Sequence, residues 1–291
     1  MALIDYDYFQ ESLNKKLFED SYSDLIKKIA EYPERYIGLF RPTKPKTKLI
    51  QNITQSHEIR FGDALEFIFE RYFETLGFTI LPKTVLDAEG NTLNIDQLFE
   101  KDNIIYLIEQ KVRDDHDSTK KRGQFNNFEN KYSVISSIYP DKTVIPIMWF
   151  IDDSLTKNRN YYKPEMERMS NDYGCTAHLF YGSQLFAEFD GIDTISSAMW
   201  DETLEYLQRW KETLPDMPEI NFDINADDVF EELKDMNTSI FRKLFTNDDI
   251  VSQIFPIIFP DGTVLRKLRS YFVSKYGTIY RTLVKYIDAI I

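Results

Sequence analysis

The chain has 291 residues, 43% of them hydrophobic, and a formal net charge of −13. It is long enough to form one large or two small domains, and it shows neither an apolar run of roughly 18 residues that would span a membrane nor an N-terminal signal peptide. A single cysteine, Cys175, excludes a disulfide framework or a cysteine-rich zinc site, and three dispersed histidines exclude a histidine-ligated zinc site. We therefore expect a cytoplasmic protein with no membrane contact.

The first part of the chain is predicted to be helical. Apolar residues recur at helical spacing over residues 5–32, and Pro33 ends the pattern. Residues 41–48, RPTKPKTK, predict an extended basic loop, because their two prolines disfavour a regular helix. An amphipathic helix is predicted from residue 61 to about 76, and a short strand follows at 78–81.

A polar turn followed by the apolar, β-branched run Ile104–Ile108 predicts a β-hairpin with a buried second strand. Asp96 is expected in the partner strand, and Glu109 and Lys111 end the apolar run. Because side chains alternate across a strand, Glu109 and Lys111 share one face while Gln110 points to the other. The hairpin is therefore expected to bring two carboxylates and an ammonium group together.

Strands and helices alternate beyond the hairpin, which is the order of an α/β fold. The predicted elements are a helix from 118, a strand at 143–151, a helix at 162–173 and a strand at 175–181. We predict a helix at 198–213, a linker at 214–218 and only helices from residue 225 onward. The expected division is a helical N-terminal extension with the basic loop (1–50), an α/β core (51–215) and a helical C-terminal subdomain (216–291).

Three oxygen ligands are expected to meet in the hairpin: the carboxylates of Asp96 and Glu109 and the backbone carbonyl of Gln110. Mg²⁺ prefers oxygen ligands in octahedral geometry and keeps several waters. An ion held there would activate a water molecule and neutralise charge that develops on a scissile phosphate, with Lys111 facing the attacking water. The hairpin thus predicts a magnesium-dependent nuclease site.

The same spacing of carboxylates and lysine occurs twice more. Glu129-Asn130-Lys131 follows several aspartates, and Glu232-Leu233-Lys234 follows Asp216, but neither triplet ends an apolar strand. We therefore select only the triplet at Glu109 as the candidate site. The sequence leaves open that this hairpin is merely an acidic, solvated strand end.

Asp96, followed by Glu109-Gln110-Lys111, resembles the motif of the PD-(D/E)xK nuclease superfamily, and the chain is most similar to its type II restriction endonucleases over about residues 58 to 182. Ile95 stands where the nominal motif has proline. Glu66 occupies a helix similar to the first core helix of the superfamily, whose glutamate often faces the metal. The resemblance implies a restriction-endonuclease-like core with a mixed central sheet flanked by helices, and catalytic roles for the three charged motif residues and Glu66. It also implies Mg²⁺-dependent hydrolysis of double-stranded DNA to 5′-phosphate and 3′-hydroxyl ends.

Basic residues are clustered despite the acidic total. Residues 35–48 contain five basic residues and no acid, residues 262–286 contain six and none, and a third cluster spans residues 111–122. Because lysine and arginine contacts with phosphate dominate DNA affinity, these clusters could line a basic cleft, although solvated helix faces are an open alternative. The predicted DNA contacts are Arg113 and His116 for base edges, Lys120, Lys121 and Arg122 for phosphates, and the loop lysines Lys44, Lys46 and Lys48.

The sequence thus favours a sequence-specific type II restriction endonuclease, and a palindromic target would favour a homodimer. Two other functions stay open: a DNA repair or recombination nuclease of the same superfamily, and a non-catalytic DNA-binding protein. The C-terminal helices could read DNA, since a helix opening at Thr278 suits a helix-turn-helix, or they could form a lid or a dimer contact.

Overall fold

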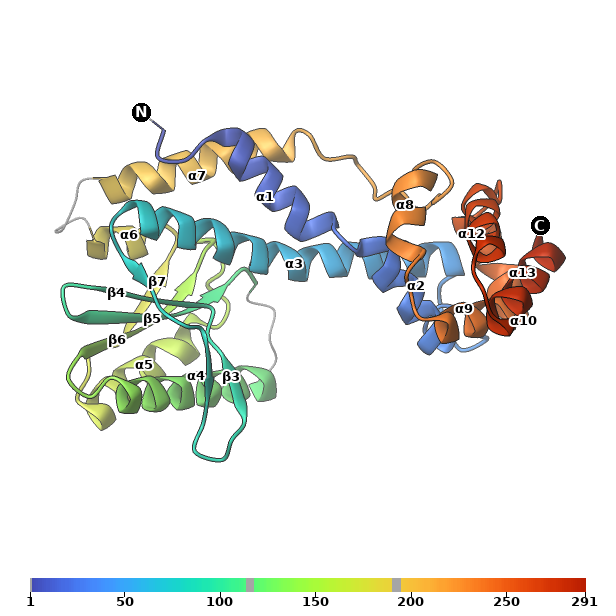
Figure 1. Cartoon of the computed structure of the whole chain (residues 1–291). Coiled ribbons are helices and arrows are strands. Elements are labelled where there is room, and N and C mark those ends of the chain that lie inside the picture. The colour runs from blue at the N-terminus through green and yellow to red at the C-terminus, as the bar shows by residue number, and fades with distance from the viewer. Residues whose placement is uncertain (1, 114–117, 190–194) are drawn as a thin grey trace. The chain divides into compact units, whose positions relative to one another are not determined.

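The computed structural model describes residues 2–113, 118–189 and 195–291 (Figure 1). The chain divides into two units, the first formed by residues 1–16 and 60–213 and the second by residues 17–59 and 214–291. Helices α1 (Tyr6–Phe18) and α3 (Pro45–Thr75) continue from one unit into the other. Among the helices of these described ranges, none has both the length and the apolar character that crossing a membrane requires.

A mixed five-stranded sheet is the centre of the first unit, with the strand order β1-β4-β5-β6-β7. β4 pairs antiparallel with β1 and β5, whereas β5, β6 and β7 run parallel. β2 and β3 form a separate antiparallel pair. The strands are β1 (Thr79–Ile80), β2 (Thr84–Leu86), β3 (Thr92–Asn94), β4 (Gln97–Lys101), β5 (Ile104–Lys111), β6 (Thr143–Phe150) and β7 (His178–Tyr181).

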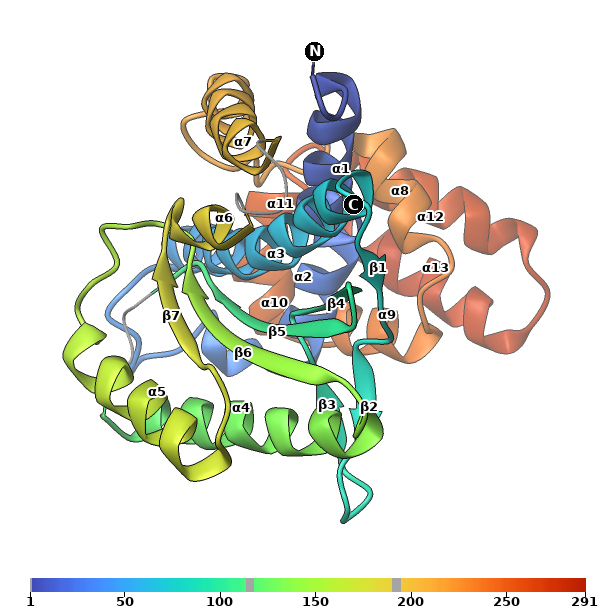
Figure 2. The same cartoon turned by 90° about the vertical axis from the view of Figure 1, so that its left-hand side faces the viewer.

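Helices cover both faces of this sheet (Figure 2). On one face, α4 (Ser118–Ile138) and α5 (Arg159–Tyr173) share an apolar cluster with β5 and β6, in which Phe128 and Leu107 are fully buried. On the other face, Phe73 of α3 stacks on Phe99 of β4 with ring centroids 4.1 Å apart, and Phe189 of α6 (Gln184–Phe189) meets the edge of Phe73. Burial on both faces explains why β5 and β6 are continuous apolar runs. The predicted α/β fold with a mixed, helix-flanked sheet is confirmed.

The second unit is helical and has its own core. Leu25 and Ile29 of α2 (Ser21–Glu31) belong to the same buried cluster as Leu244, Leu268 and Leu283 near the C-terminus. An amphipathic helix of 11 residues must bury its apolar face, and the C-terminal helices provide the partner. The remaining elements are the 3₁₀ helix η1 (Pro33–Arg35), α8 (Ala226–Leu233), α9 (Thr238–Phe245), α10 (Asp248–Gln253), α11 (Phe255–Ile258), α12 (Thr263–Ser274) and α13 (Thr278–Ile290).

The division into units differs from the three segments expected from the sequence. The predicted N-terminal extension, residues 1–50, is shared between the two units, whereas the boundary after residue 213 lies next to the predicted end of the core at 215. α7 (Ile195–Lys211) is the last helix of the first unit.

Two local predictions need correction. Of the predicted basic loop, only residues 41–44 are non-helical, because α3 begins at Pro45. Proline is tolerated in the first turn of a helix, where its missing N–H would have no helical partner. Asp96 does not lie within a strand, since it occupies the bend between β3 and β4, directly before Gln97.

Candidate active site

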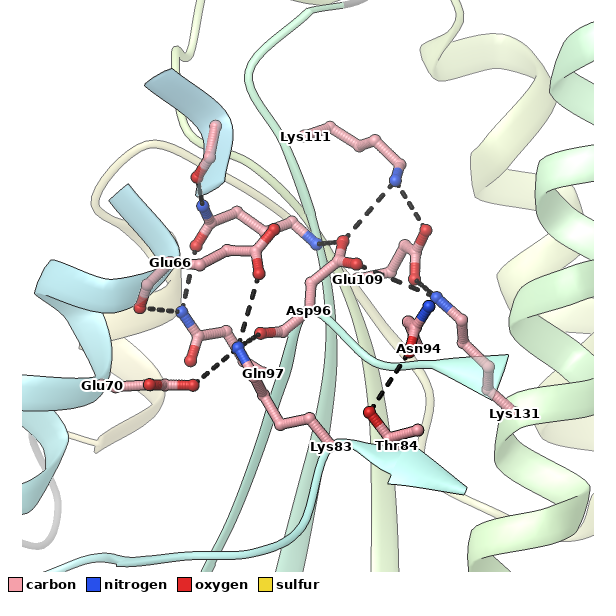
Figure 3. Close-up of polar contacts among 12 residues, drawn as sticks. Glu66, Glu70, Lys83, Thr84, Asn94, Asp96, Gln97, Glu109, Lys111 and Lys131 are labelled. Atoms are coloured by element: carbon pink, nitrogen blue, oxygen red, sulfur yellow. Dashed lines mark hydrogen bonds and ion pairs between the residues drawn. The ribbon is translucent and has the colours of Figure 1, made fainter. Parts of the chain in front are cut away.

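The sheet register brings the motif residues together at the carboxyl end of β5. Gln97, the first residue of β4, pairs with Ile108, so that Asp96 falls beside Glu109 and Gln110. The backbone N–H of Gln110 donates to Asp96 Oδ2 at 2.8 Å and fixes that carboxylate against β5. Because Glu109 and Lys111 point to one face of β5, Asp96, Glu109 and Lys111 form a single cluster (Figure 3).

Two lysines bridge the two carboxylates. Lys111 Nζ lies 2.6 Å from Glu109 Oε1 and 3.7 Å from Asp96 Oδ2. Lys131 Nζ, which comes from α4, lies 2.7 Å from Glu109 Oε2 and 3.8 Å from Asp96 Oδ1. Each ammonium group therefore contacts one oxygen of each carboxylate (Figure 3). Glu109 is 7% exposed and Lys131 is 5% exposed, so these charges attract one another with little screening by water.

The two carboxylates have different electrostatic surroundings. Burial raises the pKa of Asp96, and the charge of Glu109 raises it further, although Lys111 and Lys131 oppose the shift. Burial would also raise the pKa of Glu109, but the two ammonium groups outweigh this effect and lower it. For Lys111, burial favours the neutral amine, and the neighbouring carboxylates overcome that preference and raise the pKa. The cluster thus contains a firmly ionised Glu109 and a firmly protonated Lys111.

A second group of charges lies on the α3 side of Asp96. Lys83 Nζ donates to the backbone carbonyl of Asp96 at 2.9 Å and lies 2.7 Å from Glu70 Oε1 and 3.5 Å from Glu66 Oε2 (Figure 3). Burial raises the pKa of Glu66 to about 8, with a further contribution from the charge of Asp96 and opposition from Lys83. Glu66 therefore retains its proton near neutral pH.

The raised pKa of Glu66 predicts a pH-dependent gain in stability for Glu66→Gln. A carboxyl group whose pKa is higher in the folded state contributes most stability below its unfolded pKa, near 4.5, and loses that contribution as pH rises through about 8. We expect Glu66→Gln to match the parent at pH 4.5 and to exceed it by about 1–3 kcal/mol at pH 8. Urea unfolding with a chelator at several pH values measures the difference. Glu74→Gln, an exposed change on the same helix, serves as the control, and an equal difference at both pH values would contradict the prediction.

Side-chain amides tie the strands of the site to α3. Gln97 Nε2 donates to the Glu66 backbone carbonyl at 2.8 Å and to Gln110 Oε1 at 3.4 Å. Gln110 Nε2 donates to the Gly62 carbonyl at 3.4 Å. The Gln110 side chain thus faces α3, away from the Glu109 cluster, as strand alternation requires. The backbone carbonyl of Gln110 as a metal ligand stays a prediction.

The predicted DNA contacts are distributed over both units. Lys120, Lys121 and Arg122 occupy the first turn of α4, where Lys121 Nζ donates to Asn158 Oδ1 at 3.2 Å and lies over the Tyr161 ring. Arg113 follows β5 by two residues, and His116 is outside the described residues. Lys44 lies in the loop, whereas Lys46 and Lys48 lie in the first turn of α3, and all three belong to the second unit. Lys44 and Lys46 are exposed, and Lys48 donates to Gln51. Base reading and phosphate contact stay predictions for all of these residues.

Sequence reasoning missed three charged members of the site: Lys131, Lys83 and Glu70. Lys131 belongs to the second E-x-K triplet, which we set aside because it does not end a strand, and Glu129 of that triplet instead pairs with Arg168 at 2.9 Å. The overlooked signal was the position of Lys131 on α4, three residues after the buried Phe128 and four before the buried Ile135. A lysine on the buried stripe of a helix needs a buried partner.

Carboxylates at this site are few. In the chain as described, no cluster of three or more histidine, cysteine, aspartate or glutamate side chains has a metal-binding arrangement. Among the residues that the structure describes, Asp96 and Glu109 are the two carboxylates that the lysines bridge at the end of β5.

Comparison with known protein families gives a match over much of the first unit. Residues 78–211 match the family described as HinfI, type II restriction endonuclease. The matched segment begins just before β1 and ends with α7, and it contains Asp96, Glu109, Lys111 and Lys131. No curated protein matches the chain.

Proposed function

We propose that this chain, whose residues 78–211 form a domain of the HinfI type II restriction endonuclease family, hydrolyses phosphodiester bonds of double-stranded DNA at specific sequences. The observation that carries the proposal is the pair of carboxylates at the end of β5, of which Glu109 is buried and Asp96 is partly buried, bridged by lysine ammonium groups. A buried cluster of like and unlike charges at a strand end is typical of a functional site, because a merely structural position is more stable with apolar side chains.

The donor set suits Mg²⁺ as the cofactor. Asp96, Glu109 and the backbone carbonyl of Gln110 would hold the ion, because Mg²⁺ prefers carboxylate and carbonyl oxygen and completes its shell with water and phosphate. Bound there, Mg²⁺ supplies an activated water and neutralises charge on the scissile phosphate. The hydrogen bond from Gln110 N–H to Asp96 Oδ2 keeps one ligand in place before any ion arrives.

Lys111 contributes a positive charge that does not depend on pH near neutrality. Its pKa is raised by Glu109 and Asp96, so the ammonium group persists and can donate hydrogen bonds to the attacking water or to a phosphate oxygen. Glu66 retains a proton near neutral pH and can donate to a bridging water, or can release that proton and take part in holding a second ion. Hydrolysis of this type is expected to leave 5′-phosphate and 3′-hydroxyl ends.

The expected partner is double-stranded DNA, and a palindromic target would make the chain a homodimer, because a two-fold axis then relates both strands. The net negative charge lies mainly in the first unit, and the second unit is close to neutral. The first unit contains 19 basic and 30 acidic residues, whereas the second contains 16 basic residues, among them Lys44, Lys46 and Lys48, and 18 acidic ones. The single thiol at Cys175 is consistent with action in a reducing cytoplasm.

Incubation with supercoiled plasmid in Mg²⁺ tests the proposal. A restriction endonuclease is expected to give discrete fragments in Mg²⁺ and no cleavage in a chelator, and mapping their ends gives the recognition sequence. Nicks or junction-dependent cuts would instead indicate a repair or recombination nuclease. Binding without divalent-dependent cleavage would indicate a non-catalytic DNA-binding protein and would overturn the proposal.

A further inference from the structure

Lys131 lies at nearly the same distances from the two carboxylates as Lys111, the lysine of the motif. Its distances to Glu109 and Asp96, 2.7 and 3.8 Å, differ by only 0.1 Å from those of Lys111, 2.6 and 3.7 Å. The two lysines come from different elements, Lys111 from β5 and Lys131 from α4. Together they contact all four carboxylate oxygens of the pair.

The result is a balanced cluster of two negative and two positive groups. Each Glu109 oxygen accepts a hydrogen bond from one lysine, at 2.6 Å from Lys111 and 2.7 Å from Lys131. A divalent cation bound by Asp96 and Glu109 needs oxygens that the ammonium groups already contact. It must therefore displace at least one ammonium group, or bind against its repulsion.

Lys131 is the better candidate for displacement. Asp96 Oδ2, the oxygen nearer Lys111, is also held by the Gln110 N–H, whereas Oδ1 faces Lys131. Among the described residues, Lys131 forms hydrogen bonds and ion pairs only with these two carboxylates, as Lys111 does. The contacts of Lys131 are therefore confined to the oxygens that would hold the cation.

We propose that Lys131 is a positioning residue of this site, which holds Glu109 and Asp96 together before a divalent cation binds and competes with that cation for their oxygens. The inference rests on the proposed Mg²⁺ site and adds a second lysine to it. With both lysines in contact, the two carboxylates and two ammonium groups balance in charge. A cation must displace Lys131 from the carboxylates, and this competition lowers the affinity of the site for divalent cations.

Calorimetric titration with Mg²⁺ and with Ca²⁺ at pH 8, in the absence of DNA, tests the competition. Lys131→Met is expected to bind each ion at least about tenfold more tightly than the parent, because the cluster loses one positive charge. Lys163→Met, an exposed change on α5 with the same loss of charge, is expected to leave affinity within about twofold. The direction of the change in affinity separates the two roles. If Lys131 only held the carboxylates in place, Lys131→Met would bind the cations more weakly than the parent.

A second measurement covers the case that Lys131→Met does not fold. In the parent protein, the ¹H–¹⁵N side-chain signal of Lys131, assigned by its absence from Lys131→Arg, is expected to shift on addition of Ca²⁺. An unshifted signal at saturating Ca²⁺ would overturn the inference, as would equal or weaker binding by a folded Lys131→Met. Failure of the parent to bind either ion would overturn the proposed cofactor as well, so the two failures are distinguishable.

Discussion

Glu109→Gln is expected to lower the rate of DNA cleavage in Mg²⁺ by at least about a thousandfold, which corresponds to about 4 kcal/mol of activation free energy. Glutamine preserves the shape of the side chain but removes the negative charge that both lysines contact and that a cation requires. Asp96→Asn should have an effect of the same order, because the amide offers a poorer ligand. Single-turnover cleavage of plasmid, with the protein in excess, measures both rates.

Glu129→Gln is the matched control for this experiment. Glu129 starts the other E-x-K triplet of the first unit, and its carboxylate pairs with Arg168 at 2.9 Å rather than with the site lysines. We expect Glu129→Gln to cleave within about twofold of the parent rate. Parent-like cleavage by both Glu109→Gln and Asp96→Asn would mean that the hairpin is not the catalytic centre.

The hairpin could be predicted because its information is local. The period of two along β5 fixes which face each of Glu109, Gln110 and Lys111 takes, and the polar turn before it fixes the pairing with β4. To predict that Asp96 meets Glu109, it was enough to expect Asp96 near the end of the paired part of β4. Its exact place, in the bend before β4, depends on β3 and β4 being separate strands, and the sequence has no glycine or proline there to separate them.

The rest of the site depends on tertiary packing that a single sequence does not encode locally. Lys131 reaches Glu109 because α4 packs across the face of the sheet, and Lys83 reaches Asp96 and Glu70 from the chain between β1 and β2. Neither contact follows from spacing along the chain. The same limit applies to α2, whose apolar face gave a helix prediction but did not identify the C-terminal helices as its partner.

Lys111→Met is expected to separate chemistry from metal binding. The variant should cleave at least about a thousandfold more slowly than the parent, because the attacking water or the phosphate loses its ammonium partner. It should still bind Ca²⁺ at least as tightly, because Asp96 and Glu109 are intact and one positive charge is gone. Asp96→Asn, in contrast, should lose both DNA cleavage and Ca²⁺ binding. Single-turnover cleavage and calorimetric titration on the same preparations give the comparison.

The two lysine variants together decide which amine serves the reaction. Lys111 follows Glu109 along β5, and the neighbouring carboxylates raise its pKa, which favours Lys111 as the amine that serves the reaction. We therefore expect slow cleavage from Lys111→Met and a smaller loss from Lys131→Met, which still has Lys111 to serve the water or phosphate. The reverse order, with parent-like cleavage by Lys111→Met and a thousandfold loss in Lys131→Met, would transfer the role of the motif lysine to α4. The carboxylate assignment would survive that result, because both lysines contact the same two carboxylates.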